Sequence, residues 1–263
     1  MPGQLKVDEP ADGVLRLVIS NPAKHNALDH PILDAIAEQV AGAPARGARA
    51  LLLTGEDGMF SSGYDIADIP PDVFAREAER LVAHPFTAAL DALAATDLPV
   101  VAALGGPTIG GGLELAVHCD LRIAAHGVRL GMPPARLGLV YSHTGLRRFL
   151  DVIGESRTRE LFLLGRYVDA ARADSWGLIN AVVRDDELDA TALDWAVTLA
   201  GNAPLSIAGN KRVLRALLSA EGDLPADVEA ELIALRRACF SSEDFAEGVR
   251  AFAEKRDPHW RGR

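Results

Sequence analysis

The sequence has few of the residues on which several classes of protein depend. It contains only two cysteines, Cys119 and Cys239, which are far apart and lack the spacing of metal ligands. Neither a disulfide framework nor a zinc site is expected, and the simpler interpretation is two buried, reduced thiols. We therefore expect no bound metal.

Basic residues are also scarce, because 27 Lys and Arg stand against 37 Asp and Glu, which gives a formal net charge of −10. Binding to nucleic acid or to an anionic membrane surface needs a concentrated basic face. No apolar run approaches the roughly 20 residues of a membrane span, and residues 1–10 contain no apolar signal segment. These absences predict a soluble, cytoplasmic protein that binds neither nucleic acid nor membranes.

Short apolar segments alternate with helical stretches along most of the 263 residues, which is typical of an α/β fold. Strands are expected at about residues 14–20, 50–54, 99–104, 121–125 and 178–183. After about Gly201 the strand signals stop and apolar residues recur at helical spacing. We therefore predict a core over residues 1–200 and a helical segment over residues 201–263.

Two glycine turns are the most informative feature. They are Phe60-Ser61-Ser62-Gly63-Tyr64-Asp65 and Gly110-Gly111-Gly112-Leu113-Glu114. Each stands where an apolar strand gives way to a helix, so both can deliver backbone N–H groups to one place. Glycine allows a ligand carbonyl to approach closely, and a helix beginning after Gly111 adds the positive end of its dipole. The pair predicts an oxyanion hole.

These turns resemble those of the crotonase, or enoyl-CoA hydratase/isomerase, superfamily. The resemblance covers nearly the whole chain, from residues 21–28 (NPAKHNAL) to residues 242–256 near the C-terminus. It implies a crotonase-type ββα spiral core and a C-terminal helical trimerisation segment, in a homotrimer or dimer of trimers. It also implies an acyl-CoA thioester substrate, with coenzyme A as part of that substrate and no separate cofactor.

The resemblance assigns roles to residues around the hole. The amides of Tyr64 and Gly111 are expected to hold the thioester oxygen, and the bulk of Tyr64 to shorten or reshape the acyl pocket. Glu114 matches one of the two catalytic glutamates of hydratases. The position of the second is Pro134, so that carboxylate is absent, and hydration usually divides its proton transfers between two such groups.

The pairing of Glu114 with Tyr141 resembles methylmalonyl-CoA decarboxylase more closely. Decarboxylation needs no water-activating pair, because the thioester carbonyl takes up the electrons, and Tyr141 is expected to hold the departing carboxylate out of the carbonyl plane. Without the family, Tyr141 reads equally as a core tyrosine. His143 is a weaker candidate proton donor.

Contacts with coenzyme A are implied by resemblance only. The backbone near Lys24 and Ala27 is expected at the adenine end. The turn formed by Tyr64, Asp65, Ile66, Ala67 and Asp68 is expected beside the pantetheine and thioester. Phe252 and Lys255 are expected to reach a neighbouring subunit's nucleotide, although a core stripe and a charged helix end explain them equally well.

Three hypotheses follow. The leading one is an acyl-CoA lyase or isomerase of crotonase type, with malonyl-type decarboxylation ahead of enoyl-CoA hydration or isomerisation in fatty-acid metabolism. The second is a serine hydrolase using Ser61 or Ser62, although the chain lacks a Gly-x-Ser-x-Gly elbow. The third is a catalytically weak acyl-CoA-binding protein.

Overall fold

The structure is a computed structural model that describes residues 2–65, 82–137, 140–220, 225–240 and 242–263. Its strands are β1 (Gln4–Ala11), β2 (Val14–Ser20), β3 (Ala50–Gly55), β4 (Val100–Leu104), β5 (Thr108–Ile109), β6 (Leu121–Ala125), β7 (Arg129–Gly131), β8 (Val168–Asp169) and β9 (Ala181–Val183). Its α-helices are α1 (His30–Gly42), α3 (Thr87–Ala95), α4 (Gly111–His118), α5 (Pro134–Leu137), α6 (His143–Arg159), α7 (Ala170–Ser175), α8 (Leu188–Gly201), α9 (Pro204–Ser219), α10 (Ala226–Phe240) and α11 (Glu243–Glu254). Short helical turns are η1 (Pro22–Lys24), η2 (Ala43–Arg46), η3 (Glu56–Gly58), η4 (Val82–Phe86), η5 (Glu160–Leu164) and η6 (Asp185–Glu187).

Six strands form the main sheet in the order β1-β2-β3-β4-β6-β9, and β5, β7 and β8 form a second sheet. From β2 onward the main sheet is parallel, which confirms the predicted α/β class. Two differences from the sequence prediction are informative. The last strand begins at Ala181 and not at residue 178, because the backbone of residues 176–178 bonds to α7 and closes its C-terminal turn. The edge strand β1 was not predicted, since its half-exposed, mostly polar residues carry little apolar signal.

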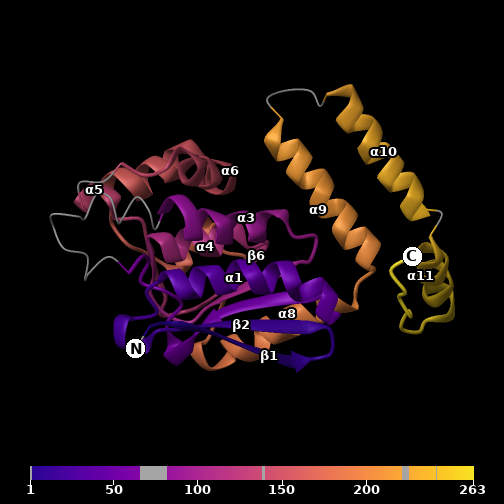
Figure 1. The fold of residues 1–263 in the computed structure, drawn as a ribbon, viewed down its shortest axis with the longest axis horizontal. Coiled ribbons are helices and arrows are strands. Elements are labelled where there is room, and N and C mark those ends of the chain that lie inside the picture. Colours follow the sequence, from indigo (N-terminus) through magenta and orange to yellow (C-terminus); the bar gives the residue numbers. More distant parts are fainter. Residues whose placement is uncertain (1, 66–81, 138–139, 221–224, 241) are drawn as a thin grey trace.

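Helices cover both faces of the main sheet (Figure 1). The helix α8 packs on one face, where its alanines meet the side chains of Leu52, Val101 and Ile123. The larger core lies on the other face, with α1, α3 and α4. Alternate residues of each strand enter the two cores, which explains why the parallel strands read as continuous apolar runs.

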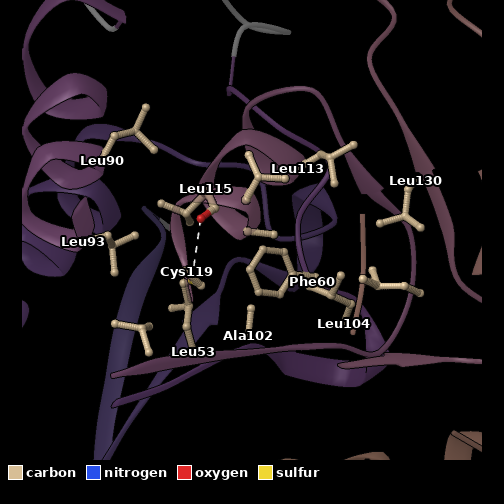
Figure 2. Packing of buried hydrophobic residues seen from close by; sticks show 14 of the residues in the cluster. Leu53, Phe60, Leu90, Leu93, Ala102, Leu104, Leu113, Leu115, Cys119 and Leu130 are labelled. Carbon is tan, nitrogen blue, oxygen red and sulfur yellow. Dashed lines mark hydrogen bonds between the residues drawn. The ribbon is translucent and has the colours of Figure 1, made fainter. Parts of the chain in front are cut away.

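The larger core lies under both glycine turns. Figure 2 shows Phe60 pointing into a cluster with Leu104, Leu113 and Leu115. Phe60 is the first residue of the first turn, Leu113 belongs to the second, and Leu115 follows the second turn on α4. One set of buried side chains therefore anchors both turns.

Beyond α8 the described chain is helical, as predicted, and α9 to α11 stand beside the layered core (Figure 1). The helix α9 is fastened to the core by ion pairs of Arg212 and Arg215 with Asp97, and of Lys211 with Asp120. The division at residue 200 and the trimerising role of these helices remain predictions. Residues 66–81, which include Ile66, Ala67 and Asp68 of the turn expected beside the thioester, lie outside the described residues.

The loop over residues 21–28 supports the first glycine turn. The side chain of Asn26 holds this loop in place through three hydrogen bonds to the backbone. The Asn26 side chain is buried; its Nδ2 donates to the carbonyls of Glu56 and Met59 at 2.9 and 2.7 Å. Its Oδ1 accepts from the amide of Asn21 at 2.9 Å. Asn26 has φ of 54°, a left-handed conformation that Asn tolerates better than most residues.

We expect Asn26→Ala to lower the free energy of unfolding by about 1–3 kcal/mol, because buried backbone groups lose their partners. Urea denaturation measures the change. Asn210→Ala is the matched control, since Asn210 is exposed on α9, and it should cost less than about 0.5 kcal/mol. Equal stability of the two variants would contradict this role of Asn26.

Candidate active site

The two glycine turns lie side by side. Ser61 and Thr108 form a parallel bridge, and the amide of Ile109 donates to the carbonyl of Ser61 at 3.0 Å. A Cβ atom on Gly112 would stand 2.6 Å from that same carbonyl oxygen, so the second turn reaches the first only because Gly112 has no side chain.

The backbone of each turn also requires glycine. Gly63 has φ of 102° and Gly110 has φ of 55°, both in the region that side chains disfavour. A Cβ on Gly63 would lie 2.9 Å from the carbonyl oxygen of Ile109 and 3.4 Å from the amide nitrogen of Gly111. The first turn thus ends next to the N-terminus of α4.

The predicted oxyanion donors are the amides of Tyr64 and Gly111. Tyr64 is fixed by its bridge to Leu28, in which the Leu28 amide donates to Gly63 and the Leu28 carbonyl accepts from Asp65. Gly111 is the first residue of α4, where amides have no partner within the helix. Within the described residues neither amide is hydrogen-bonded, so both are available to a ligand. Their role remains a prediction.

Glu114 lies one turn along α4 from Gly111, on the same side of the helix. Its side chain is only 1% exposed. Burial raises the pKa of the Glu114 carboxyl to about 7, and a hydrogen bond from Tyr141 opposes part of that rise. Glu114 is therefore poised near neutral pH, where it can both give and take a proton.

Tyr141 is brought to Glu114 by the start of α6. Its hydroxyl donates to Oε2 of Glu114 at 2.5 Å, and its ring meets Phe162 edge to face with centroids 5.3 Å apart. Ser142 caps α6 by accepting from the amide of Gly145 at 3.1 Å. A Cβ on Gly145 would stand 2.5 Å from Oε1 of Glu114, so this glycine gives the carboxyl its space. The structure thus brings together Glu114 and Tyr141, which the sequence reasoning paired.

His143, the weaker candidate, is exposed in the first turn of α6. Among the described residues it makes no hydrogen bond to Glu114 or Tyr141.

Pro134 stands close to the site but supplies no carboxylate. It begins α5, three residues after Gly131, whose carbonyl accepts from the amide of Gly110 at 2.9 Å. Pro134 itself is buried. Across the described ranges, no second carboxylate is hydrogen-bonded to Glu114 or Tyr141.

Sequence reasoning missed His118, four residues after Glu114 on α4. Its Nδ1 lies 2.8 Å from the carbonyl oxygen of Glu114. Burial lowers the pKa of His118 to about 4, so the ring is neutral, and Nδ1 must carry the proton because a carbonyl only accepts. The helical spacing from Glu114 was the available signal. His118 steadies the turn of α4 that carries Glu114.

The residues predicted to hold coenzyme A fall into two groups. Lys24 and Ala27 lie beside the first turn, where Nζ of Lys24 contacts the Asp65 carboxylate at 2.8 Å and the Lys24 carbonyl accepts from Ser62. Lys255 is exposed and directly follows α11. Figure 1 shows α11 well apart from α4. Phe252 lies in α11, and its side chain is not among those that the structure describes. Ile66, Ala67 and Asp68 also lie outside the described residues.

The serines of the first turn do not form a nucleophile and base. Ser61 is fully buried, and its hydroxyl accepts from the amide of Gly63 at 3.2 Å. The Ser62 hydroxyl donates to the carbonyl of Lys24. No histidine side chain among the described residues is hydrogen-bonded to either one, which disfavours the hydrolase hypothesis.

The described residues contain no cluster of three or more His, Cys, Asp or Glu side chains able to hold a metal ion. The described helices also include none with the length and apolar character needed to cross a membrane.

Comparison with known proteins agrees with this geometry. The sequence profile of the enoyl-CoA hydratase/isomerase family matches residues 9–263. The chain is 33% identical to a probable enoyl-CoA hydratase of Mycobacterium bovis, over 96% of this chain and 97% of that one. It is 32% identical to a carnitinyl-CoA dehydratase of Salmonella heidelberg, over 81% of each chain.

Solved structures show the same fold. An enoyl-CoA hydratase/carnithine racemase from Magnetospirillum magneticum superposes with a TM-score of 0.88 at 29% identity, covering 98% of this chain and 96% of that one. An enoyl-CoA hydratase from Bacillus anthracis gives 0.87 at 25% identity, covering 99% and 100%. The chain therefore belongs to the enoyl-CoA hydratase/isomerase, or crotonase, family of acyl-CoA-processing enzymes.

Proposed function

We propose that this enzyme decarboxylates a malonyl-type acyl-CoA through a thioester enolate. The observation that carries the proposal is the buried Glu114, hydrogen-bonded to Tyr141 beside the paired turns, with a proline where hydratases have their second glutamate. The pairing of Glu114 with Tyr141 resembles methylmalonyl-CoA decarboxylase. A single carboxyl with a pKa of about 7 suits a reaction that needs one proton delivered to carbon.

In this mechanism the thioester oxygen accepts hydrogen bonds from the amides of Tyr64 and Gly111. The bond from the substrate carboxylate to the α-carbon breaks, carbon dioxide leaves, and the electron pair passes to the thioester oxygen as an enolate. Protonated Glu114 then gives its proton to the α-carbon and regains one from solvent. Before that transfer, protonated Glu114 donates to the Tyr141 oxygen, which frees the Tyr141 hydroxyl to hold the substrate carboxylate out of the carbonyl plane.

Coenzyme A enters as part of the substrate, and no separate cofactor is needed. The loop carrying Lys24 and Ala27 adjoins the first turn, which supports its assignment to the adenine end. The residues from Tyr64 to Asp68, which overlap the end of the first turn, are assigned to the pantetheine and thioester. Phe252 and Lys255 are assigned to the nucleotide of a neighbouring subunit.

Hydration of an enoyl-CoA, or the reverse dehydration, is the second candidate. The names of the relatives favour it, since one is a probable enoyl-CoA hydratase and another a carnitinyl-CoA dehydratase. Glu114 would then act alone, taking a proton from water and returning one to the α-carbon.

The substrate panel that decides between these reactions consists of malonyl-, methylmalonyl-, ethylmalonyl- and 2-enoyl-CoA, with products read by mass spectrometry. We expect loss of carbon dioxide from a malonyl-type thioester. Glu114→Gln should lower kcat by about 10²–10⁴-fold while leaving the Kd for acyl-CoA nearly unchanged. Tyr141→Phe should cost roughly 0.5–3 kcal/mol in the same step.

Tyr167→Phe is the matched control for Tyr141→Phe, because Tyr167 is half exposed and lies on another segment. It should leave kcat unchanged. A wild-type enzyme that hydrates enoyl-CoA efficiently and ignores every malonyl-type thioester would contradict decarboxylation.

The pH dependence of kcat separates the two reactions independently. Decarboxylation uses protonated Glu114, so kcat should be full below pH 7 and fall about tenfold per pH unit well above it. Hydration uses the ionised Glu114 carboxylate, so its kcat would instead rise with pH and level off above about pH 7. Because the Tyr141 hydrogen bond lowers the pKa of Glu114, Tyr141→Phe should move the limb to higher pH. Survival of the limb in Glu114→Gln would show that another group titrates.

We also propose a homotrimer or dimer of trimers, assembled through α9 to α11. Three leucines of α9, at positions 214, 217 and 218, are about half exposed in the single chain and share one side of the helix. Sedimentation velocity at micromolar concentration should show a trimer or hexamer. Leu214→Lys with Leu218→Lys should shift the distribution toward smaller species, whereas a wild-type protein that sediments only as a monomer would refute the assembly.

A further inference from the structure

The side chain of Tyr64 lies against the second glycine turn. A Cβ atom on Gly111 would stand 2.7 Å from Cε1 of Tyr64 and 3.0 Å from its Cζ, so the ring is in direct contact with the Gly111 backbone. The ring also meets Phe86 edge to face, with centroids 4.6 Å apart and planes at 88°. These two contacts restrict the ring to one orientation.

The phenol end of Tyr64 reaches the acid. Its hydroxyl neighbours that of Tyr141, which donates to Glu114. Burial, and then the charge of Glu114, raises the pKa of Tyr64 well above its usual range, so the phenol keeps its proton. Tyr64 therefore presents ring carbons to Gly111 and a neutral polar tip to Tyr141, which is hydrogen-bonded to the proposed acid.

The position of the ring has a consequence for the acyl group. Tyr64 contributes its amide to the proposed oxyanion hole, and its side chain contacts Gly111, whose amide is the other proposed donor. The Tyr64 ring therefore occupies volume immediately beside the proposed position of the thioester. Protein interiors are close-packed, and volume filled by a fixed ring is closed to an acyl chain.

The geometry points to Tyr64 as a specificity-determining residue that restricts the site to short acyl groups carrying a polar substituent, such as a carboxylate, next to the thioester. This inference rests on the proposed acyl-CoA binding at the two turns, but it does not depend on which reaction follows.

The polar part of this preference comes from the hydroxyls. The hydroxyls of Tyr64 and Tyr141 are neighbours and that of Tyr141 donates to Glu114, so the three groups adjoin one another; we take them as a polar wall of the proposed site. An apolar chain placed on that wall would remove water from polar groups without replacing their hydrogen bonds, whereas a carboxylate or hydroxyl replaces them. The Tyr64 ring thus limits the length of the acyl chain, and its hydroxyl favours an acyl group that carries a polar substituent.

The test is calorimetric binding of saturated acyl-CoA thioesters, which need no turnover. Each methylene that is fully buried corresponds to about fourfold in affinity. We expect wild-type affinity to gain nothing from butyryl- to octanoyl-CoA, because the Tyr64 ring leaves the added methylenes no space to be buried. Tyr64→Ala should improve octanoyl-CoA relative to butyryl-CoA by at least about tenfold, because the space of the ring opens to the chain.

Tyr64→Phe separates the ring from its hydroxyl. It should keep the limit on chain length and lose about two- to tenfold of the preference for methylmalonyl-CoA over isobutyryl-CoA, in which a methyl group replaces the carboxylate. These two ligands are compared in a Glu114→Gln background, so that methylmalonyl-CoA is not consumed.

Tyr167→Ala is the matched control, because its ring lies against a different glycine, Gly131, and its loss should leave the chain-length profile unchanged. Melting temperatures verify that each variant folds, and Tyr64→Leu replaces Tyr64→Ala if the latter unfolds. An affinity that rises about fourfold per methylene in wild type, and equally in Tyr64→Ala, would overturn the inference.

The outcomes also separate this inference from the proposed function. Short-chain selectivity that depends on Tyr64, without turnover of any malonyl-type thioester, would support the inference and refute decarboxylation. A wild-type protein that binds no acyl-CoA would overturn both.

Discussion

The contact between two glycine turns is the constraint on which the site depends. Ser61 and Gly112 approach at a distance that a single Cβ atom would forbid, and Gly63 lies equally close to the carbonyl of Ile109. The buried cluster around Phe60 holds the turns together from below. The contact therefore joins two segments about fifty residues apart, and the helix that starts at the second turn carries the acid.

The chemistry of that acid follows from where the contact places it. Glu114 lies one helical turn beyond the Gly111 amide, the proposed donor, so its position relative to Gly111 is set by a helix and not by a loop. The same packing buries the carboxyl and raises its pKa to about 7. Tyr141 moderates that rise through one hydrogen bond. A carboxyl with this pKa is suited to give or take a proton near neutral pH, which is the role proposed for Glu114.

The sequence predicted those features that depend on local pattern. Continuous apolar runs located β2, β3, β4 and β6, because strands buried on both faces leave that signature. The glycines and Glu114 were recognisable from spacing and family resemblance. The edge strand β1 was not, since its half-exposed residues carry little apolar signal, and the short strands β5, β7 and β8 were not, since they pair with segments distant in the sequence. The neutral His118 and the contact of Tyr64 with Gly111 likewise arise from tertiary packing, which no local pattern records.

Tyr64 shows why the side chains and the backbone of such a site cannot vary independently. A larger residue at Gly111 would strike the Tyr64 ring, and a smaller residue at position 64 would leave Gly111 uncovered. The proposed oxyanion donors are backbone amides, so that role places no demand on the side chain at position 64. The proposed acyl pocket, however, is shaped by that side chain. In this chain one tyrosine ring contacts Gly111 and neighbours Tyr141 at its tip, so the proposed pocket size and the proposed polar wall around Glu114 depend on the same side chain. On the proposed function, the residue that offers a donor amide also sets the selectivity for the acyl group.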